Sequence, residues 1–397
     1  MDRRWARLVG KGIPIIGPIP GERGNLLVTF VWRPNRRVVA ASVFTPLADF
    51  ARGETQLQSL GVGGVWYRSF RLSRRTCASY GFSSRPLPRR DAGEKAWFRY
   101  LVTVRPDPLN SRHIVFAKDP YDPSDFTGTH SVLELPGVPA QPWSAVRQPS
   151  RWKEERHRMR SRYIRGRRTV FVFLPSGFRP EKTRYNLLIA FDGILYRDTV
   201  PTPRIVENLV AAGRLRPTVV VLVGNAPDAR TKELGCNPAF AAFLSHELLP
   251  WLRRPYGLSA RPSQTVLAGS SLGGVASAHA ALLYPRLFGN VLAQSGAFHW
   301  APAGRGSKSI SLHREYARAS RLPLRFYLDA GTRESTFVGS TGESLLGSVR
   351  HMRDVLEAKG YPVTYAEFEG GHDHTCWRGT LADGIIALLG RESKRIA

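Results

Sequence analysis

The run Gly269-Ser270-Ser271-Leu272-Gly273 is the feature that most constrains this 397-residue chain. The apolar Thr265–Ala268 before it is typical of a buried strand, and the small residues of Gly273–Leu283 after it are typical of a helix. A strand, a sharp turn and a helix in this order form an elbow that presents a serine hydroxyl at the edge of a sheet. A Gly/Ser turn that merely starts a helix has the same letters. The prediction of an elbow therefore rests on the expected strand before the run and the expected helix after it, and not on the five residues alone.

From Thr169 onward the chain alternates between apolar runs and segments with helical spacing. Runs that are apolar throughout are typical of strands buried on both faces of a parallel sheet. Between them, Pro203–Ala212, Ala239–Leu252 and Glu343–Lys359 have apolar residues at helical spacing. This alternation predicts an α/β domain with a mostly parallel sheet and helices on both faces. The other expected strands are Thr169–Leu174, Asn186–Phe191, Thr218–Val223, Asn290–Ala293, Leu324–Leu328 and Val363–Phe368.

The first third of the chain predicts an all-β domain. Short apolar or aromatic runs are separated by turn residues, as in an antiparallel sandwich. The segment Asp107–Pro142 is rich in proline, aspartate and serine, which is typical of an extended connection between domains. We therefore expect a β-sandwich at residues 1–145 and the α/β domain at residues 146–397. The expected strands of the sandwich are Leu26–Trp32, Val38–Phe44, Val65–Phe70 and Ala96–Val102.

A serine nucleophile needs a base that takes its proton and an acid that orients the base. In this architecture the acid and then the histidine follow the serine along the chain. Glu334 lies in the loop just after the apolar run Leu324–Ala330, as such acids do, whereas the competing Asp329 falls inside that run. His372 follows the expected strand Val363–Phe368 after a Gly-Gly turn. We therefore predict Ser271 as nucleophile, His372 as base and Glu334 as acid.

Two backbone amides are expected to stabilise the oxyanion that forms during attack on an ester. The Leu272 N–H lies at the start of the expected helix, directly after Ser271. The second donor of this architecture comes from the loop after an early strand. Gly193 or its neighbour Ile194 occupies that place, although a plain strand-to-loop turn is the alternative.

The cysteines and histidines do not predict a metal site. Cys77, Cys236 and Cys376 contain no CxxC pair, so we expect no disulfide framework and a reducing compartment. His372, His374 and Cys376 alternate, but no further Cys/His pair with ligand spacing accompanies them. We also expect no signal peptide and no membrane insertion, because charged, glycine and proline residues interrupt the apolar runs.

The net charge of +27 is unusual, and 49 of the 58 basic residues are arginines. Such an excess favours anionic partners such as nucleic acid, a membrane surface or an acidic small molecule. A general preference for arginine codons has the same effect on composition. The basic segment Arg147–Arg168 is either a solvated face or a basic wall beside an anionic ligand.

Strings along nearly the whole chain resemble the enterochelin esterases, the ferric enterobactin hydrolases also called Fes-type siderophore esterases. In the second part these strings are Phe191-Asp192-Gly193, Arg230–Pro238, Glu247–Trp251 and Gly370–Arg378. In the first part they are Pro18–Gly21, Val28–Trp32, Val65–Phe70, Asp107–Asn110 and Leu133–Pro136. The resemblance implies an immunoglobulin-like sandwich ahead of an α/β-hydrolase domain.

The resemblance also implies a function, which is hydrolysis of the ester bonds of a ferric, enterobactin-like catecholate siderophore in the cytoplasm. Its motifs map onto Ser271 and His372. Arg230 takes the place of a family arginine that meets the substrate, and Trp377, in the string that contains His372, is assigned to substrate binding as well. No cofactor is expected, because the substrate carries the iron. The expected partner is an anionic ferric siderophore and not nucleic acid.

Two other interpretations remain open from the sequence. One is a general carboxylesterase or acyltransferase of the same fold. The other is a non-catalytic protein that binds an anionic ligand or nucleic acid. For nucleic acid the chain offers charge but no recognition motif.

Overall fold

The chain divides into two compact units in the structure, a computed structural model. One unit comprises residues 1–118, 126–140 and 369–376, and the other comprises residues 119–125, 141–368 and 377–397. The single boundary expected between residues 145 and 146 stays a prediction. The residues described are 5–6, 10, 12–35, 37–48, 53–61, 64–89, 93–122, 125–147, 149–182, 184–300, 311–335 and 342–391.

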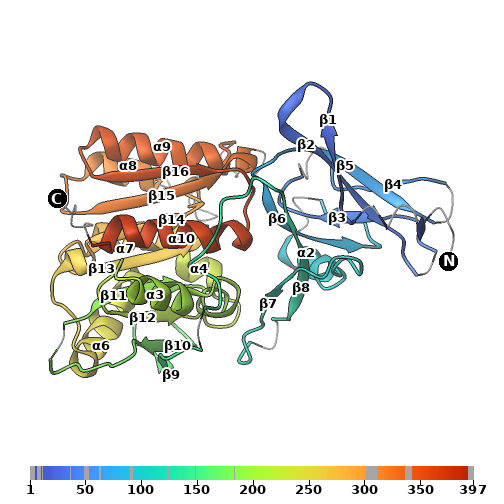
Figure 1. Cartoon of the computed structure of the whole chain (residues 1–397). Coiled ribbons are helices and arrows are strands. Elements are labelled where there is room, and N and C mark those ends of the chain that lie inside the picture. Colours follow the sequence, from blue (N-terminus) through green and yellow to red (C-terminus); the bar gives the residue numbers. More distant parts are fainter. Residues whose placement is uncertain are drawn as a thin grey trace, which may run out of the picture. The chain divides into compact units, whose positions relative to one another are not determined.

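The first unit is built from short antiparallel strands. They are β1 (Ile15–Ile19), β2 (Glu22–Trp32), β3 (Ser42–Phe44), β4 (Gln58–Ser59), β5 (Trp66–Ser73), β6 (Cys77–Ser83), β7 (His113–Phe116) and β8 (Gly128–Glu134). They form one sheet in the order β1-β2-β5-β4 and another in the order β3-β6-β8-β7. Phe30 of β2 packs on Tyr80 of β6, with ring centroids 4.7 Å apart, and both belong to one buried cluster. The predicted all-β sandwich is therefore confirmed (Figure 1).

The strand expected at Ala96–Val102 is wrong, because these residues lie largely in helix α2 (Gly93–Leu101). The stretch is apolar apart from Arg99 and rich in aromatic residues, a composition that is also typical of a short strand. Tyr100 is only 3% exposed, whereas Phe98 is 41% exposed, so the helix buries one side. Ring contacts at i, i+3 spacing, between Trp97 and Tyr100, match that burial.

The second unit is organised around one large sheet. Its strands are β9 (Lys153–Arg160), β10 (Arg167–Leu174), β11 (Asn186–Phe191), β12 (Thr218–Val223), β13 (Thr265–Ser270), β14 (Asn290–Gln294), β15 (Arg325–Gly331) and β16 (Val363–Phe368). They lie in the order β16-β15-β14-β13-β11-β12-β10-β9. The pairs from β16 to β12 are parallel, and only β10 and β9 run antiparallel to their neighbours. The predicted mostly parallel sheet is confirmed.

Helices cover both faces of this sheet. They are α3 (Thr202–Ala211), α4 (Arg230–Leu234), α5 (Pro238–Phe243), α6 (Leu249–Tyr256), α7 (Leu272–Leu283), α8 (Leu312–Arg318), α9 (Leu345–Ala358) and α10 (His374–Leu389). Leu188 and Ala190 of β11 belong to the same core cluster as residues of α3 and α10. Leu187 and Ile189 pack instead with residues of α5 to α9. Alternate strand residues thus fill two cores, and in Figure 1 α3 and α10 lie in front of the strands.

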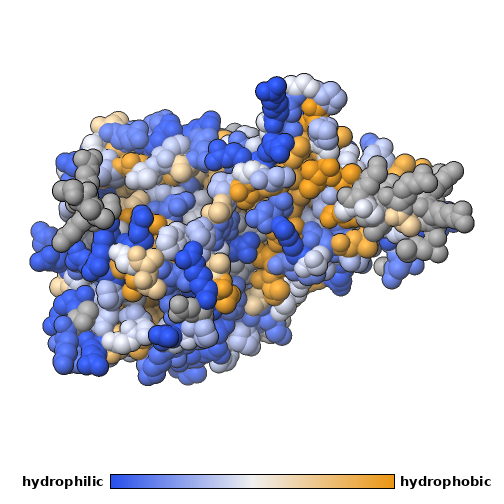
Figure 2. Space-filling view, in the orientation of Figure 1, coloured by the Kyte–Doolittle hydropathy of each residue, from blue (hydrophilic) through white to orange (hydrophobic). Residues whose placement is uncertain are grey.

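The arginine-rich segment contains the edge strand β9, whose residues alternate between exposed and partly buried. Arg156 and Arg197 each place a guanidinium 5.2 Å from the ring centroid of Phe171. Arg158 lies 4.0 Å from the ring centroid of Tyr121. The charged guanidinium groups themselves therefore lie over aromatic rings, as in cation–π contacts. Figure 2 shows hydrophilic residues over most of the visible face of the second unit.

In the described part of the chain, no helix combines the length and the apolar composition that crossing a membrane requires.

One arginine of β10 is fully buried. The Arg168 side chain has no exposed surface, and its Nη1 donates to Glu233 Oε1 of α4 at 2.9 Å. Its Nη2 donates to the carbonyl oxygen of Arg165, and its guanidinium lies 5.0 Å from the ring centroid of Phe243. Burial raises the pKa of the Glu233 carboxyl, and the charge of Arg168 opposes that rise. This pair joins α4 to the sheet.

Replacing Arg168 by methionine should destabilise the chain by about 3–5 kcal/mol, because it leaves the Glu233 carboxylate buried without its partner. The matched control is Arg162→Met, whose exposed pair with Glu247 contributes less than about 1 kcal/mol. Urea unfolding of both variants at neutral pH measures the difference. Equal free energies of unfolding for the two variants would show that Arg168 is not needed to compensate Glu233.

Candidate active site

Ser271 occupies a strained turn between β13 and α7. Its backbone angles are φ +56° and ψ −121°, a conformation that costs a non-glycine residue about 1–3 kcal/mol. The neighbouring glycines are required by contact, because a Cβ on Gly269 would lie 2.6 Å from the carbonyl carbon of Gly273. A Cβ on Gly274 would lie 3.0 Å from the Cβ of Ala293 in β14. The run thus has the strand–turn–helix form that the sequence predicts.

Parallel register brings the other candidate residues to the edge of the sheet where Ser271 lies. Ser270 pairs with Gln294, and Gln294 pairs with Asp329, so β13, β14 and β15 end side by side. On the other flank β11 pairs with β13 and ends at Phe191. Ligands and catalytic groups of such sheets lie beyond the carboxyl ends of the strands.

The two expected oxyanion donors lie at adjacent strand ends. Leu272 is the first residue of α7, so its N–H has no acceptor within the helix. Gly193 follows β11 and lies against β12, because a Cβ there would be 2.8 Å from the Gly224 nitrogen. The Asp192 carboxylate lies 3.7 Å from the position of a Cβ on Gly273. The loop with Gly193 therefore adjoins the first turn of α7.

Arg230 pairs with Asp192 and not with Glu233, the partner that Arg168 takes. Its Nε and Nη2 donate to the two carboxylate oxygens of Asp192 at 2.7 and 2.8 Å. Asn225 donates its side-chain amide to Asp192 Oδ1 at 2.8 Å. The Asp192 side chain is 4% exposed, whereas that of Arg230 is 41% exposed. Among the described residues no hydrogen bond involves Arg230 Nη1, so this nitrogen can face a ligand.

The sequence placed Asp192 in the turn after an expected strand but assigned no role to its carboxylate, and it assigned none to Asn225. The available signal was positional: Asp192 directly follows a buried strand, and Asn225 lies two residues after the end of the neighbouring strand. Asp192 also has φ +54°, which marks a constrained loop beside the elbow.

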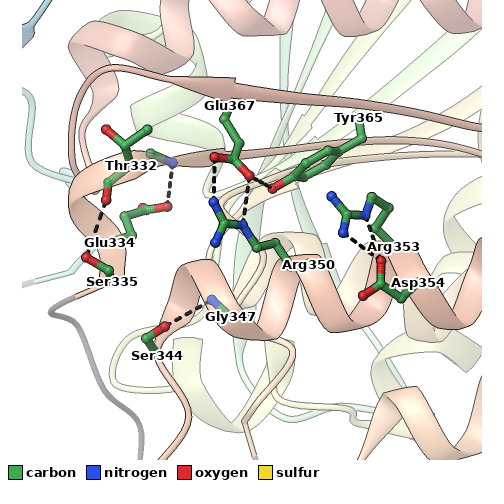
Figure 3. A network of polar contacts seen from close by, with 11 residues as sticks. Thr332, Glu334, Ser335, Ser344, Gly347, Arg350, Arg353, Asp354, Tyr365 and Glu367 are labelled. Atoms are coloured by element: carbon green, nitrogen blue, oxygen red, sulfur yellow. Dashed lines mark hydrogen bonds and ion pairs between the residues drawn. The ribbon is translucent and has the colours of Figure 1, made fainter.

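Glu334 lies in the short helical turn Thr332–Ser335 after β15, where the sequence predicts the acid. It is 1% exposed, and its Oε2 accepts a hydrogen bond from the Gly331 N–H at 2.8 Å. Figure 3 shows this hydrogen bond, and it shows Arg350 bound by both oxygens of Glu367. The nearby guanidinium is thus engaged elsewhere.

Asp329, the competing acid, has a different environment. It lies within β15 with no exposed surface, and its Oδ1 accepts from the Ser295 N–H at 3.1 Å. Burial raises the pKa of Asp329 to about 8, and the like charge of Glu334 contributes to the rise. A carboxyl that is mostly protonated at neutral pH is a weak partner for a histidine cation, which favours Glu334.

The raised pKa of Asp329 predicts a pH-dependent stability. The folded chain keeps a proton that the unfolded chain releases above the ordinary value of 3.8, so this stabilisation is lost as pH rises towards about 8. Between about pH 5 and 8, wild type should lose up to about 1.4 kcal/mol per pH unit more than Asp329→Asn. Urea unfolding across this range measures both slopes. Identical slopes would mean that Asp329 is ionised in the folded chain.

His372, the expected base, lies half-buried in the loop between β16 and α10, and this loop groups with the first unit. Its neighbour Asp373 is 2% exposed and accepts two hydrogen bonds, from the N–H groups of Thr375 and Ser79. Gly371 has no room for a side chain, because a Cβ there would collide with the carbonyl oxygen of Pro46. Local contacts therefore fix the backbone on both sides of His372.

Trp377, the other residue assigned to substrate binding, is only 2% exposed. Its indole Nε1 donates to the Ser295 hydroxyl at 3.0 Å, and its ring packs in the core beneath α3 and α10. In this conformation the indole is not available to a substrate. The indole contacts Ser295 instead, which directly follows β14.

His313, Glu343 and His351 have ligand atoms within 4.8 Å of one another, the spacing of a candidate metal centre. His351 Nδ1 lies 3.4 Å from Glu343 Oε1. However, the two imidazole rings are stacked, with centroids 4.2 Å apart and planes 13° from parallel. Lone pairs in nearly parallel ring planes do not converge on one ion, so this geometry does not favour a metal.

Comparison with known proteins agrees with this geometry. The esterase family model matches residues 161–388, and the model of the enterochelin esterase N-terminal domain matches residues 27–144. An iron(III) enterobactin esterase of Escherichia coli K12 is 28% identical over 388 residues, which cover 91% of this chain and 90% of that protein. An iron(III) salmochelin esterase of Escherichia coli O6:H1 is 27% identical over 399 residues, with coverage of 97% and 93%. The crystal structure of a Shigella flexneri enterobactin esterase with 2,3-dihydroxy-N-benzoyl-serine is 25% identical, with a TM-score of 0.74 over 98% of both chains.

A mostly parallel sheet with helices on both faces and a serine elbow after a central strand define the α/β-hydrolase class. The chain belongs to the esterase family, and its N-terminal domain is of the enterochelin esterase type. The resemblance expected from the sequence strings is therefore confirmed.

Proposed function

We propose that this chain is a serine esterase that hydrolyses the ester bonds of a ferric, enterobactin-like catecholate siderophore and so releases its iron. The observation that carries the proposal is the combination of a serine elbow with an N-terminal domain of the enterochelin esterase type. Relatives with both parts along nearly their whole length are iron(III) enterobactin esterases.

The proposed mechanism uses Ser271, His372 and Glu334. His372 takes the proton of Ser271 as its oxygen attacks an ester carbonyl, and the Leu272 and Gly193 amides hold the resulting oxyanion. The intermediate collapses to an acyl-enzyme, and protonated His372 gives its proton to the leaving alcohol. Water, activated by the same histidine, then releases the acid. Support comes from chain order, since His372 follows β16, whose carboxyl end lies on the same sheet edge as that of β13.

Cleavage of the siderophore scaffold loosens the grip on iron, because it removes the linkage that holds the catechols around the metal. The iron belongs to the substrate, and we propose that the enzyme needs no cofactor of its own. We further propose a cytoplasmic location and a domain boundary near residues 145–146. No nucleic-acid partner and no membrane insertion form part of this proposal.

Arg230 is the proposed contact for the anionic substrate, through its Nη1. Its other two nitrogens neutralise Asp192, which lies next to the oxyanion donor Gly193. Without Arg230, a buried negative charge would face the place where negative charge develops during attack. Arg230 therefore supports both capture of the substrate and the acyl step.

Ser271→Ala and His372→Ala should each lower turnover by several orders of magnitude with the fold intact, because they remove the nucleophile and its base. Glu334→Gln should cost less, because the acid only orients His372. Mass spectrometry of the products from ferric and iron-free siderophores, with circular dichroism of each variant, measures these effects. Near-wild-type hydrolysis by Ser271→Ala would refute the mechanism. Equal activity on simple aryl esters and on siderophores would favour a general carboxylesterase.

Arg230→Ala should weaken ferric-siderophore binding by about 1–3 kcal/mol, measured in a Ser271→Ala background. With Ser271 intact, it should also lower kcat on a small neutral ester, because Asp192 is left charged beside the oxyanion donors. Adding Asp192→Asn should restore the small-ester kcat but not the siderophore affinity.

The double variant separates the two roles of Arg230. No loss of affinity in Arg230→Ala would remove this residue from the substrate site. Loss of affinity without any change in kcat on the small ester would mean that Asp192 does not influence the oxyanion.

A further inference from the structure

A buried polar network lies directly behind the elbow, and the mechanism above does not use it. The N–H of Ser271 donates to the carbonyl oxygen of Gln294 at 2.9 Å. The carbonyl oxygen of Ser271 accepts from the Ala297 N–H at 3.2 Å. Both backbone polar groups of the strained serine are therefore held by the segment 294–297, which begins with the last residue of β14.

That segment is itself irregular and needs support. Ser295 has φ +47°, an uncommon conformation for a residue other than glycine. Its N–H donates to the Asp329 carbonyl oxygen at 2.9 Å, and its hydroxyl accepts from the Trp377 indole at 3.0 Å. Backbone pairing alone does not hold the turn, because side chains from other elements complete it.

The Gln294 side chain is the centre of the network and has no exposed surface. Its Oε1 accepts from the Tyr196 hydroxyl at 2.8 Å. Its Nε2 donates to the Trp377 carbonyl oxygen at 2.9 Å and to the Thr380 hydroxyl at 2.6 Å. The Trp377 carbonyl oxygen can only accept, so the nitrogen of the Gln294 side chain must face it. This contact fixes the orientation of the Gln294 side-chain amide. Burial raises the pKa of Tyr196, so its hydroxyl stays protonated and able to donate.

Two of these partners come from segments next to other proposed site residues. Tyr196 belongs to the π-helical turn Leu195–Thr199, which directly follows Asp192 and Gly193. Thr380 lies in α10, and Gln294 itself binds the backbone of Ser271. Gln294 thus contacts the turn after Gly193 and α10 through its side-chain amide, and the backbone of Ser271 through its own carbonyl oxygen.

We propose that Gln294 is a positioning residue that keeps Ser271 in register with the Gly193 amide, with Tyr196 and Thr380 as the groups that hold it. The proposal rests on Ser271 as the nucleophile of the proposed function. Gln294 does not touch substrate, because it is fully buried. Its effect is on the geometry of attack, to which rates are sensitive even at displacements near 1 Å.

Tyr196→Phe tests this proposal, with Tyr316→Phe as the matched control. Tyr316 is equally buried and donates its hydroxyl to the Ala278 carbonyl oxygen at 2.7 Å, at the middle of α7. Each variant loses one buried tyrosine hydroxyl, so both should show a similar fall in Tm. Only Tyr196→Phe should lower kcat on p-nitrophenyl acetate, by about tenfold, with KM changed less than about twofold.

The rate at which a fluorophosphonate labels Ser271 gives a second readout, which requires no siderophore. It should fall in Tyr196→Phe in parallel with kcat and stay within about twofold of wild type in Tyr316→Phe. Equal kcat and labelling rates in the two variants would overturn the proposal. Should Tyr196→Phe not fold, Thr380→Val decides, since it keeps the shape and removes one acceptor of Gln294. An unchanged labelling rate in Thr380→Val would then overturn it.

Peptide mapping separates the two proposals. Labelling at Ser271 that is absent in Ser271→Ala supports the nucleophile, whatever the siderophore assay shows. Labelling at another residue would refute the nucleophile and, with it, the positioning role of Gln294.

Discussion

The backbone contact between Gly269 in β13 and Gly273 in α7 is the constraint on which the candidate site depends. A Cβ on Gly269 would lie 2.6 Å from the Gly273 backbone, so the helix approaches the strand more closely than any side chain permits. This approach forces the turn to be sharp and places Ser271 at φ +56°. The strain persists because hydrogen bonds to both backbone groups of Ser271 oppose its relaxation. The geometry of the candidate site therefore depends on the close packing of Gly269 against Gly273, which imposes the turn, and on the hydrogen bonds that hold Ser271 in it.

The parts of this arrangement that depend on periodicity could be predicted from the sequence. Apolar runs such as Thr218–Val223 became buried strands because backbone pairing needs only local pattern and burial on both faces. The elbow could be predicted because glycines at this spacing indicate that the backbones of the strand and the helix approach each other closely. Ala96–Val102 was mispredicted as a strand because a short stretch that is apolar apart from Arg99 fits a buried strand as well as a helix. Glu334 could be located from its place after a strand, which topology alone determines.

The polar partners could not be predicted in the same way. Asp192 with Arg230, and Gln294 with Tyr196, are separated by tens of residues in the chain and by at least one other element. Their pairing depends on side-chain direction at the ends of neighbouring strands, which no local pattern records. Trp377 shows the consequence, because a residue assigned to substrate from its string lies in the core instead. Hydrogen bonds between residues distant in the chain are thus the part of the site that could not be predicted from the sequence.

The arginines have different roles in the interior of the second unit and at its surface. Arg168 compensates one buried carboxylate and Arg230 another, whereas Arg156 and Arg158 lie on aromatic rings at the edge of the sheet. Exposed charges attract an anion over distance, but salt screens them within about 10 Å at moderate ionic strength. Arg230 differs because its partner Asp192 is buried beside Gly193, the proposed oxyanion donor. A negative charge left there would oppose the oxyanion through a medium that screens poorly. In the proposed mechanism, the pairing of Arg230 with Asp192 therefore allows a loop that contains an acid to stabilise the oxyanion.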